Sequence, residues 1–106
     1  MYQDLSITDL RKELDSGNIT KEELFNNANS LAHKYQDSIN SFVTIIDDFK
    51  CRKSNSILYG IPYALKDNIS TKGILTTSCS NILKDYIPVY DATVYKKLKN
   101  SGAVLV

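Results

Sequence analysis

The sequence predicts an α/β fold that begins with two helices and continues into a mixed sheet with a βαβ crossover. Two segments near the start of the chain carry helical apolar stripes and helix caps. Further on, two apolar runs at residues 61–65 and 103–106 enclose a third helical pattern, which is the order of a strand, a crossover helix and a strand. Such a connection implies parallel strands and a right-handed crossover.

The first predicted helix begins after Ser6, whose hydroxyl is placed to accept a hydrogen bond from an amide of the first turn. Asp9 lies at the third helical position, where a carboxylate suits the helix dipole. An apolar stripe follows the spacing i, i+3 and i+7: Ile7, Leu10 and Leu14. Gly17 predicts the end of this helix, because glycine readily adopts the left-handed conformation found there.

The second helix is predicted at residues 21–36. Thr20 and Glu23 form a capping box, in which each side chain can bind the backbone amide of the other residue. Apolar residues then keep to one helical face over three turns: Leu24, Phe25, Ala28, Leu31, Ala32 and Tyr35.

Three later segments are predicted as strands. Residues 42–46 are apolar and β-branched, whereas residues 47–55 are polar, without periodicity, and are expected to form a loop or a short helical connection. Residues 61–65 form a continuous apolar run that fits a strand buried on both faces, with Pro62 near its start, where a missing N–H is tolerated. Residues 103–106 begin another buried strand.

A third helix is predicted between the last two strands, with Asp91 as its N-cap and Gly102 as the left-handed residue at its end. Three of its residues are expected to face the core: Val94, Tyr95 and Leu98. Three lysines are expected to face solvent: Lys96, Lys97 and Lys99.

The composition is that of a globular protein without a marked charge. The 106 residues, 42% hydrophobic and 24% charged, provide one domain at most. Thirteen Lys and Arg against twelve Asp and Glu leave a net charge of +1, so the chain lacks the basic excess of a surface that binds nucleic acid directly. It also lacks an apolar run of roughly 20 residues and a secretory signal. A cytoplasmic location without membrane association is therefore expected.

The two cysteines, Cys51 and Cys79, are far apart in the sequence. Free thiols in a reducing cytosol are the favoured state, and a disulfide is the alternative. The single His33 cannot complete a zinc site of the usual spacing with them, and no sequence feature links it to either cysteine as a catalytic base. No metal site is predicted.

Residues 1–106 are expected to form the N-terminal portion of one longer domain, with a helical segment at 1–37 and the start of an α/β core at 41–106. This expectation rests on Val106, which lies inside an apolar strand with no turn or polar tail after it. A small complete domain with a C-terminal strand is the alternative.

Lys66 is the candidate functional residue. Phosphate-binding glycine loops, H-E-x-x-H and G-x-S-x-G motifs are absent. Lys66 follows the buried run 61–65 directly, so it lies at the carboxyl end of a strand, where α/β sheets bind ligands. Partial shielding from water favours the neutral form of a lysine, which is suited to act as a base, and alternation along the extended segment points Asp67 to the opposite face. The alternative is a surface lysine that ends a strand.

The stretch 60–80, G-I-P-Y-A-L-K-D-N-I-S-T-K-G-I-L-T-T-S-C-S, resembles the first conserved block of the amidase-signature family. The likeness continues through Y-D-A-T at 90–93 and covers essentially the whole chain. Three motifs, T-K-G at 71–73, T-T at 76–77 and this Y-D-A-T, resemble, within that family, the A subunits of the amidotransferases that convert Glu-tRNA(Gln) to Gln-tRNA(Gln). The chain departs from the family at residues 47–58, where the connection is shorter than usual.

The resemblance implies a Ser–cis-Ser–Lys triad in which Lys66 takes a proton from a bridging serine, which in turn activates a nucleophilic serine. The nucleophile would attack the side-chain amide of glutamine, form an acyl-enzyme and release ammonia. Both serines belong to a Gly/Ser-rich block outside this sequence, and the serines at 70, 78 and 80 lack its glycine context. The chain alone is therefore expected to be inactive.

The resemblance also implies partners. These are the B and C subunits of the amidotransferase, with tRNA held mainly by the B subunit. ATP and Mg²⁺ are expected on the partner that activates the tRNA-bound glutamate, and no cofactor is expected in this chain. Two alternatives stay open: part of a stand-alone amidase, and a non-catalytic assembly module.

Overall fold

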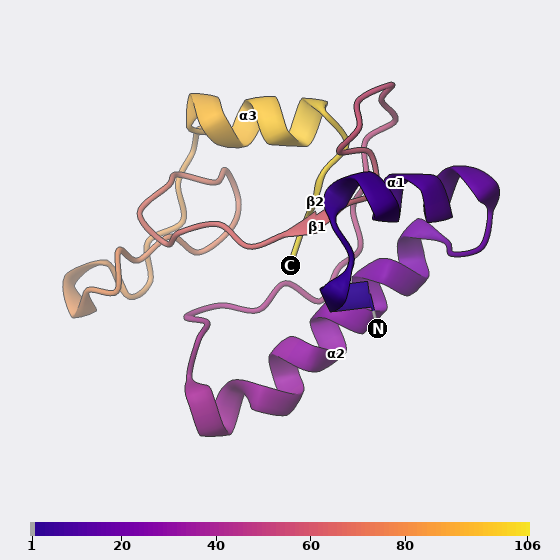
Figure 1. Cartoon of the computed structure of the whole chain (residues 1–106). Helices are drawn as coiled ribbons and strands as arrows, with labels where there is room; N and C mark the ends of the chain where they lie inside the picture. The colour runs from indigo at the N-terminus through magenta and orange to yellow at the C-terminus, as the bar shows by residue number, and fades with distance from the viewer. Residues whose placement is uncertain (1) are drawn as a thin grey trace.

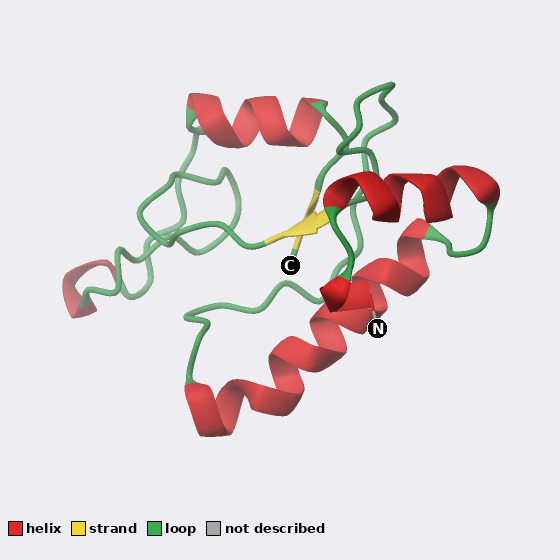
Figure 2. Ribbon diagram, viewed as in Figure 1, coloured by secondary structure: helices red, strands yellow, loops and turns green. Residues whose placement is uncertain are grey.

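The computed structural model describes residues 2–106 and confirms the α/β class. Its elements in chain order are η1 (Tyr2–Asp4), α1 (Ile7–Ser16), α2 (Lys21–Ile39), β1 (Pro62–Tyr63), η2 (Asn81–Leu83), α3 (Thr93–Asn100) and β2 (Val104–Leu105). Figure 1 shows the two strands at the centre, with α1 and α2 on one side and α3 above. Figure 2 shows that loops make up most of the chain between α2 and α3.

The two N-terminal helices begin where local signals predict. The Ser6 hydroxyl accepts a hydrogen bond from a first-turn amide at 3.1 Å, and Thr20 and Glu23 form the complete capping box. Gly17 ends α1 with a φ of 77°, as predicted. α2 continues one turn beyond the predicted end, since Asn40 supplies its left-handed C-cap at a φ of 52°. No helix in the described part of the chain combines the length and apolar character needed to cross a membrane.

The strands β1 and β2 pair in parallel with α3 in the connection between them, as predicted. The register joins Pro62 to Val104 and Tyr63 to Leu105. The Val104 N–H of β2 donates at 2.9 Å to the carbonyl of Ile61, the residue before β1. Both strands are shorter than predicted, and Ala64 is already exposed, so burial on both faces does not extend through residue 65. Within residues 2–106 the sheet is two-stranded and parallel.

The strand predicted at 42–46 is wrong. No backbone–backbone hydrogen bond joins this segment to another part of residues 2–106. Apolar, β-branched composition favours a pleated surface only where a neighbouring strand offers its edge. β1 and β2 pair with each other, and α2 instead binds segment 42–46 through its side chains.

The N-terminus of α3 differs from the prediction. Its N-cap is Ala92, and no side chain caps the helix. The Asp91 carboxylate instead accepts hydrogen bonds from the Lys99 ammonium at 2.6 Å and the Lys72 N–H at 2.8 Å. These two donors hold the pKa of Asp91 below its ordinary value, and the Lys99 ammonium has the larger effect. Asp91 thus ties the start of α3 to its own last turn and to the preceding loop.

The faces of α3 follow the prediction only in part. Tyr95 is buried, but Val94 is 48% exposed and does not face the core. Lys99 is half-buried because it binds Asp91 rather than solvent alone. At the C-terminus, Gly102 has the predicted left-handed φ of 77°. The next amide then binds the Leu98 carbonyl at 3.2 Å, which completes a Schellman-type helix end.

Two apolar clusters connect the N-terminal helices to the strands. The first comprises Leu10, Ile19, Leu24 and Ile61. The second comprises Phe25, Val104 and Val106, with Phe49 packed against it. Polar contacts add to the first cluster: the Arg11 guanidinium donates to the Tyr59 carbonyl at 2.5 Å, and the Lys21 ammonium lies 4.9 Å from the Tyr59 ring centroid. The chain that leads into β1 is therefore anchored to α1 and α2.

Candidate functional site

Lys66 follows β1 by three residues, at the carboxyl end of the strand as predicted. It lines a hollow of about 350 Å³ together with residues 41–44 and 46. Lys66 is exposed, and its side chain forms no hydrogen bond or ion pair within residues 2–106. The described residues therefore leave its ammonium free to bind another group, but they do not provide the shielding from water that was expected.

The hollow combines apolar walls with a few polar groups. Its apolar side chains include Phe42, Val43, Ile46, Leu65, Ile69 and Leu105. Its polar residues besides Lys66 include Ser41, Thr44, Thr76 and Cys79. Residues 41–46 carry no sequence signal for this site, since the composition of 42–46 is that of a core strand.

Asp67 binds the loop that follows β1 rather than Lys66. Its carboxylate accepts hydrogen bonds from the Thr77 N–H at 2.9 Å, from the Cys79 N–H at 3.2 Å and from the Thr77 hydroxyl. Its backbone carbonyl accepts one from the Ser78 N–H at 2.8 Å. Desolvation alone would raise the pKa of Asp67, but the hydrogen bonds from Thr77 and Cys79 outweigh it and hold this pKa below its ordinary value. Asp67 therefore acts as an ionised brace for residues 67–79.

This brace stabilises an unusual backbone conformation. Ser78 and Cys79 both have left-handed φ angles, of 50° and 55°, although neither is glycine. A left-handed non-glycine residue costs on the order of 1 kcal/mol, so two in succession require support from their surroundings. Asp67 provides it, because its carboxylate and carbonyl accept hydrogen bonds from both amides. The same turn brings Cys79 to the hollow that Lys66 lines.

The serines left unassigned in the sequence analysis have structural partners. The Ser70 hydroxyl donates to the Tyr90 hydroxyl at 3.2 Å, and the Ser80 hydroxyl caps η2 by accepting from the Ile82 N–H at 3.2 Å. Ser78 forms the turn braced by Asp67. These contacts give each of the three serines a structural role, consistent with their lack of the glycine context of a nucleophile.

Within residues 2–106, the two cysteines are not bonded to each other, and neither forms a hydrogen bond with His33. Cys51 and Cys79 are free thiols, as predicted, and burial raises the pKa of Cys51, whose thiol donates to the Gly102 carbonyl at 3.2 Å. His33 binds Asp47, with 2.7 Å between Nε2 and Oδ1. Residues 2–106 contain no group of His, Cys, Asp and Glu that could hold a metal ion.

Comparison with known families covers most of the chain, including the segment that contains Lys66. The family model described as Amidase matches residues 20–106. The chain belongs to the amidase family. The matched region contains the amidase segment after β1 with Lys66 and Asp67, together with α2, α3 and both strands.

Curated relatives of this amidase chain include A subunits of glutamyl-tRNA(Gln) amidotransferase. The protein of Lactobacillus acidophilus is 39% identical over 109 positions, covering 99% of this chain and 23% of its own length. That of Sulfolobus acidocaldarius is 44% identical over 108 positions, covering 94% of this chain and 23% of its own length. The amidase chain is homologous to the N-terminal region of these A subunits. It spans about a quarter of the length of these relatives.

The fold agrees with these matches. The crystal structure of the glutamyl-tRNA(Gln) amidotransferase A subunit from Thermotoga maritima superposes on all of this chain with a TM-score of 0.82 and 32% sequence identity. The superposed part is 23% of that structure. The prediction of an amidase-signature fold is therefore confirmed, and the group of A subunits is favoured over the two alternatives.

Proposed function

We propose that this chain is the N-terminal part of the glutamine-hydrolysing component of a Glu-tRNA(Gln) amidotransferase, and that Lys66 is the base of its active site. The similarity to the A subunits supports the parent enzyme. The observation that carries the role of Lys66 is its position: it lies just beyond β1, unpaired within residues 2–106, beside an open hollow of about 350 Å³. A hollow of this size suits the side-chain amide of a small substrate.

In the proposed reaction, the neutral amine form of Lys66 accepts at Nζ the proton of a bridging serine, which accepts the proton of the nucleophilic serine. The serine oxygen then forms a bond to the amide carbon of glutamine, and ammonia leaves with a proton returned through the same relay. Water hydrolyses the acyl-enzyme to glutamate. Asp67 supports this role because it binds the following loop and leaves the Lys66 side chain without an ion pair.

The ammonia is proposed to pass to a partner protein that activates the tRNA-bound glutamate with ATP and Mg²⁺. We propose the B and C subunits of the amidotransferase as partners, tRNA contacts mainly through the B subunit, and a cytoplasmic location. The net charge of +1 supports this division, because a surface that binds tRNA directly carries a clear basic excess.

The test uses Lys66→Ala in the full-length protein, in complex with its partners. Glutamine-dependent activity is expected to fall about 10²–10⁴-fold, the range of general-base catalysis. Activity with free ammonia as the nitrogen donor is expected to persist, because Lys66 serves ammonia release and not the ATP-dependent step. Lys53→Ala is the matched control, since Lys53 is exposed and lies outside the hollow. Near-normal glutamine-dependent activity of Lys66→Ala would overturn the role of Lys66.

The alternative of a stand-alone amidase is tested separately. The full-length protein is expected to co-purify with a partner that resembles the B subunit. A monomer that hydrolyses a small amide without any partner would overturn the amidotransferase proposal and leave the role of Lys66 intact.

A further inference from the structure

Helix α2 presents a row of polar side chains toward segment 42–47. Asn29, His33 and Gln36 have the spacing i, i+4 and i+7 and therefore lie on one face of the helix. Each of them binds the segment that follows the helix. We call these three residues the polar row of α2.

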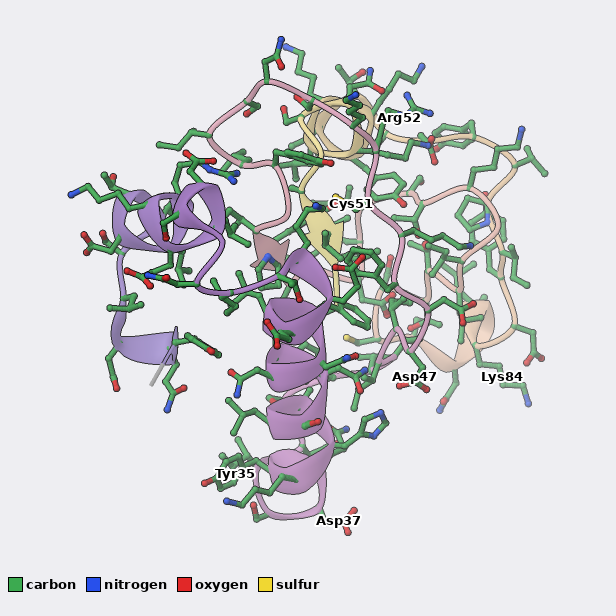
Figure 3. The ribbon with its side chains drawn as sticks, turned by 90° about the vertical axis from the view of Figure 1, so that its right-hand side faces the viewer. Tyr35, Asp37, Asp47, Cys51, Arg52 and Lys84 are labelled. Atoms are coloured by element: carbon green, nitrogen blue, oxygen red, sulfur yellow. The ribbon has the colours of Figure 1, made fainter. Side chains whose placement is uncertain are left out.

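The first two members of the polar row hold the C-terminal end of the segment. The Asn29 amide donates to the Ile46 carbonyl at 2.9 Å and to Asp47 Oδ1 at 3.0 Å. His33 Nε2 lies 2.7 Å from the same Asp47 oxygen. Figure 3 labels Asp47 beside the α2 ribbon. The hydrogen bond with His33 is the largest cause of a pKa of Asp47 below its ordinary value, and the hydrogen bond from Asn29 is the next. The Asp47 carboxylate is therefore an anionic anchor near neutral pH.

Gln36 holds the other end of the segment by both atoms of its amide. Its Nε2 donates to the Phe42 carbonyl at 2.7 Å, and its Oε1 accepts from the Phe42 N–H at 3.2 Å. One residue of a neighbouring strand would satisfy the backbone of Phe42 in the same way. The side chain of Gln36 thus takes the place of a strand edge.

The segment depends on these contacts because its backbone has no other described partner. Within residues 2–106, no backbone–backbone hydrogen bond reaches residues 42–47. In the described part of the chain, all hydrogen bonds to the backbone of this segment come from Asn29 and Gln36. This explains how residues 42–46 are held in place although they are not part of the sheet.

The same segment forms a wall of the hollow beside Lys66. Phe42, Val43, Thr44 and Ile46 line that hollow together with Lys66. A displacement of the segment along α2 would therefore change the shape of the space next to the lysine, while β1 and the Asp67 brace stay in place.

We propose that Asn29, His33 and Gln36 are positioning residues for the reaction at Lys66: they fix segment 42–47 as the wall against which the substrate amide is held. This inference rests on the proposed function of Lys66. A purely structural role of the polar row is the competing interpretation, and it predicts a loss of folded protein without a specific effect on glutamine.

The experiment measures kcat and KM for glutamine, and activity with free ammonia, in the full-length protein in complex with its partners. Gln36→Glu keeps the acceptor for the Phe42 N–H but places a carboxylate oxygen against the Phe42 carbonyl. Asn26→Asp is the matched control, because it adds the same charge at an exposed position of α2 whose side chain has no hydrogen bond in the described part of the chain. His33→Leu and His33→Gln form a second pair, since glutamine retains a donor for Asp47.

Gln36→Glu is expected to lower kcat/KM for glutamine about 10- to 100-fold, mainly through KM, with ammonia-dependent activity unchanged. Asn26→Asp is expected to behave as the unsubstituted protein. His33→Leu is expected to raise KM for glutamine in the same direction, and His33→Gln to restore it.

An unchanged KM in Gln36→Glu, with Lys66→Ala inactive toward glutamine, would overturn this inference and leave the proposed function standing. Should Gln36→Glu lose the ammonia-dependent activity as well, the pair at residue 33 decides. If His33→Leu raises KM for the substrate and His33→Gln does not, the result supports a positioning role. If His33→Leu and His33→Gln have the same KM, the positioning role is rejected. Retention of glutamine-dependent activity in Lys66→Ala would instead reject the proposed function itself.

Discussion

Gly17 and Gly102 offer a matched pair of alanine substitutions that measures how closely the chain approaches itself next to β2. Both residues end a helix in the left-handed conformation, with a φ of 77° at each. A Cβ added at Gly17 meets no atom within 4 Å. A Cβ added at Gly102 would lie 2.6 Å from the Arg52 carbonyl oxygen and 2.7 Å from Tyr59 Cδ2. The carbonyl is backbone, so it cannot rotate away as the end of a side chain could.

The two substitutions share one cost and differ in two others. Left-handed alanine costs about 1–2 kcal/mol at either position. At Gly102, displacement of the Arg52 backbone adds about 1–3 kcal/mol of overpacking. The hydrogen bond from the Gly60 N–H to the Gly102 carbonyl, 2.9 Å long, adds about 1 kcal/mol when it is lost. We therefore expect the free energy of unfolding to fall by about 1–2 kcal/mol in Gly17→Ala and by about 3–6 kcal/mol in Gly102→Ala.

The assay is urea unfolding of the full-length protein carrying each substitution, followed by circular dichroism. The difference between the two midpoints, at a common slope, reports the close approach at Gly102 alone. Equal shifts of the two midpoints would refute this reasoning, because they would show that the chain near Arg52 moves aside at no measurable cost.

Further predictions concern the isolated chain and two carboxylates. The 106-residue chain alone is expected to show no glutaminase turnover above a Lys66→Ala control, and to keep its helical circular dichroism after the near-ultraviolet signal of fixed packing is lost; a cooperative transition in both signals would contradict this. Asp67→Asn in the full-length protein is expected to lower glutamine-dependent kcat about 10-fold and spare ammonia-dependent activity, because an amide cannot accept all three hydrogen bonds that the carboxylate accepts; unchanged kcat would argue against the brace. Lys99 and the Lys72 N–H lower the pKa of Asp91 from 3.8, so its stabilisation is present above that value and is lost as pH falls through the lower folded-state pKa. Asp91→Asn should flatten acid unfolding in that range, and an unaltered acid-unfolding curve would exclude the linkage.

The features that the sequence predicted well are those determined by neighbours along the chain. The cap at Ser6, the capping box at Thr20 and the left-handed turns at Gly17 and Gly102 each need only a few consecutive residues. The parallel pairing of β1 and β2 was also predicted, because an apolar run, a helix and a second run restrict the connection strongly.

The wrong predictions concern contacts between segments that are far apart in the sequence. Residues 42–46 have the composition of a strand, but the side chains of α2 bind them instead. Asp91 has the residue type of an N-cap, yet Lys99 and the Lys72 amide compete successfully for its carboxylate. The composition of the 42–46 segment and the identity of Asp91 do not reveal which distant donor reaches them.

The candidate site shows the same division. The position of Lys66 after a strand could be predicted from its neighbours. The Asp67 brace could not be predicted, because it joins residues that are ten or more positions apart. It also depends on two residues with left-handed φ angles, neither of which is glycine. A sequence signal for it exists only in retrospect, as a carboxylate followed by a threonine and serine-rich turn.

Helix α1 lies before residue 20, where the match to the amidase family begins, yet it contacts the residues that lead into β1, the strand before Lys66. Leu10 belongs to the cluster that buries Ile61, and Arg11 binds the Tyr59 carbonyl. A part of the chain outside the family pattern thus covers a surface inside it. Amidases without an equivalent helix must cover that surface with another element or place polar residues there. We therefore expect residues 10 and 61 to vary together among relatives, so that a hydrophobic residue at 61 accompanies the helix and a polar one accompanies its loss.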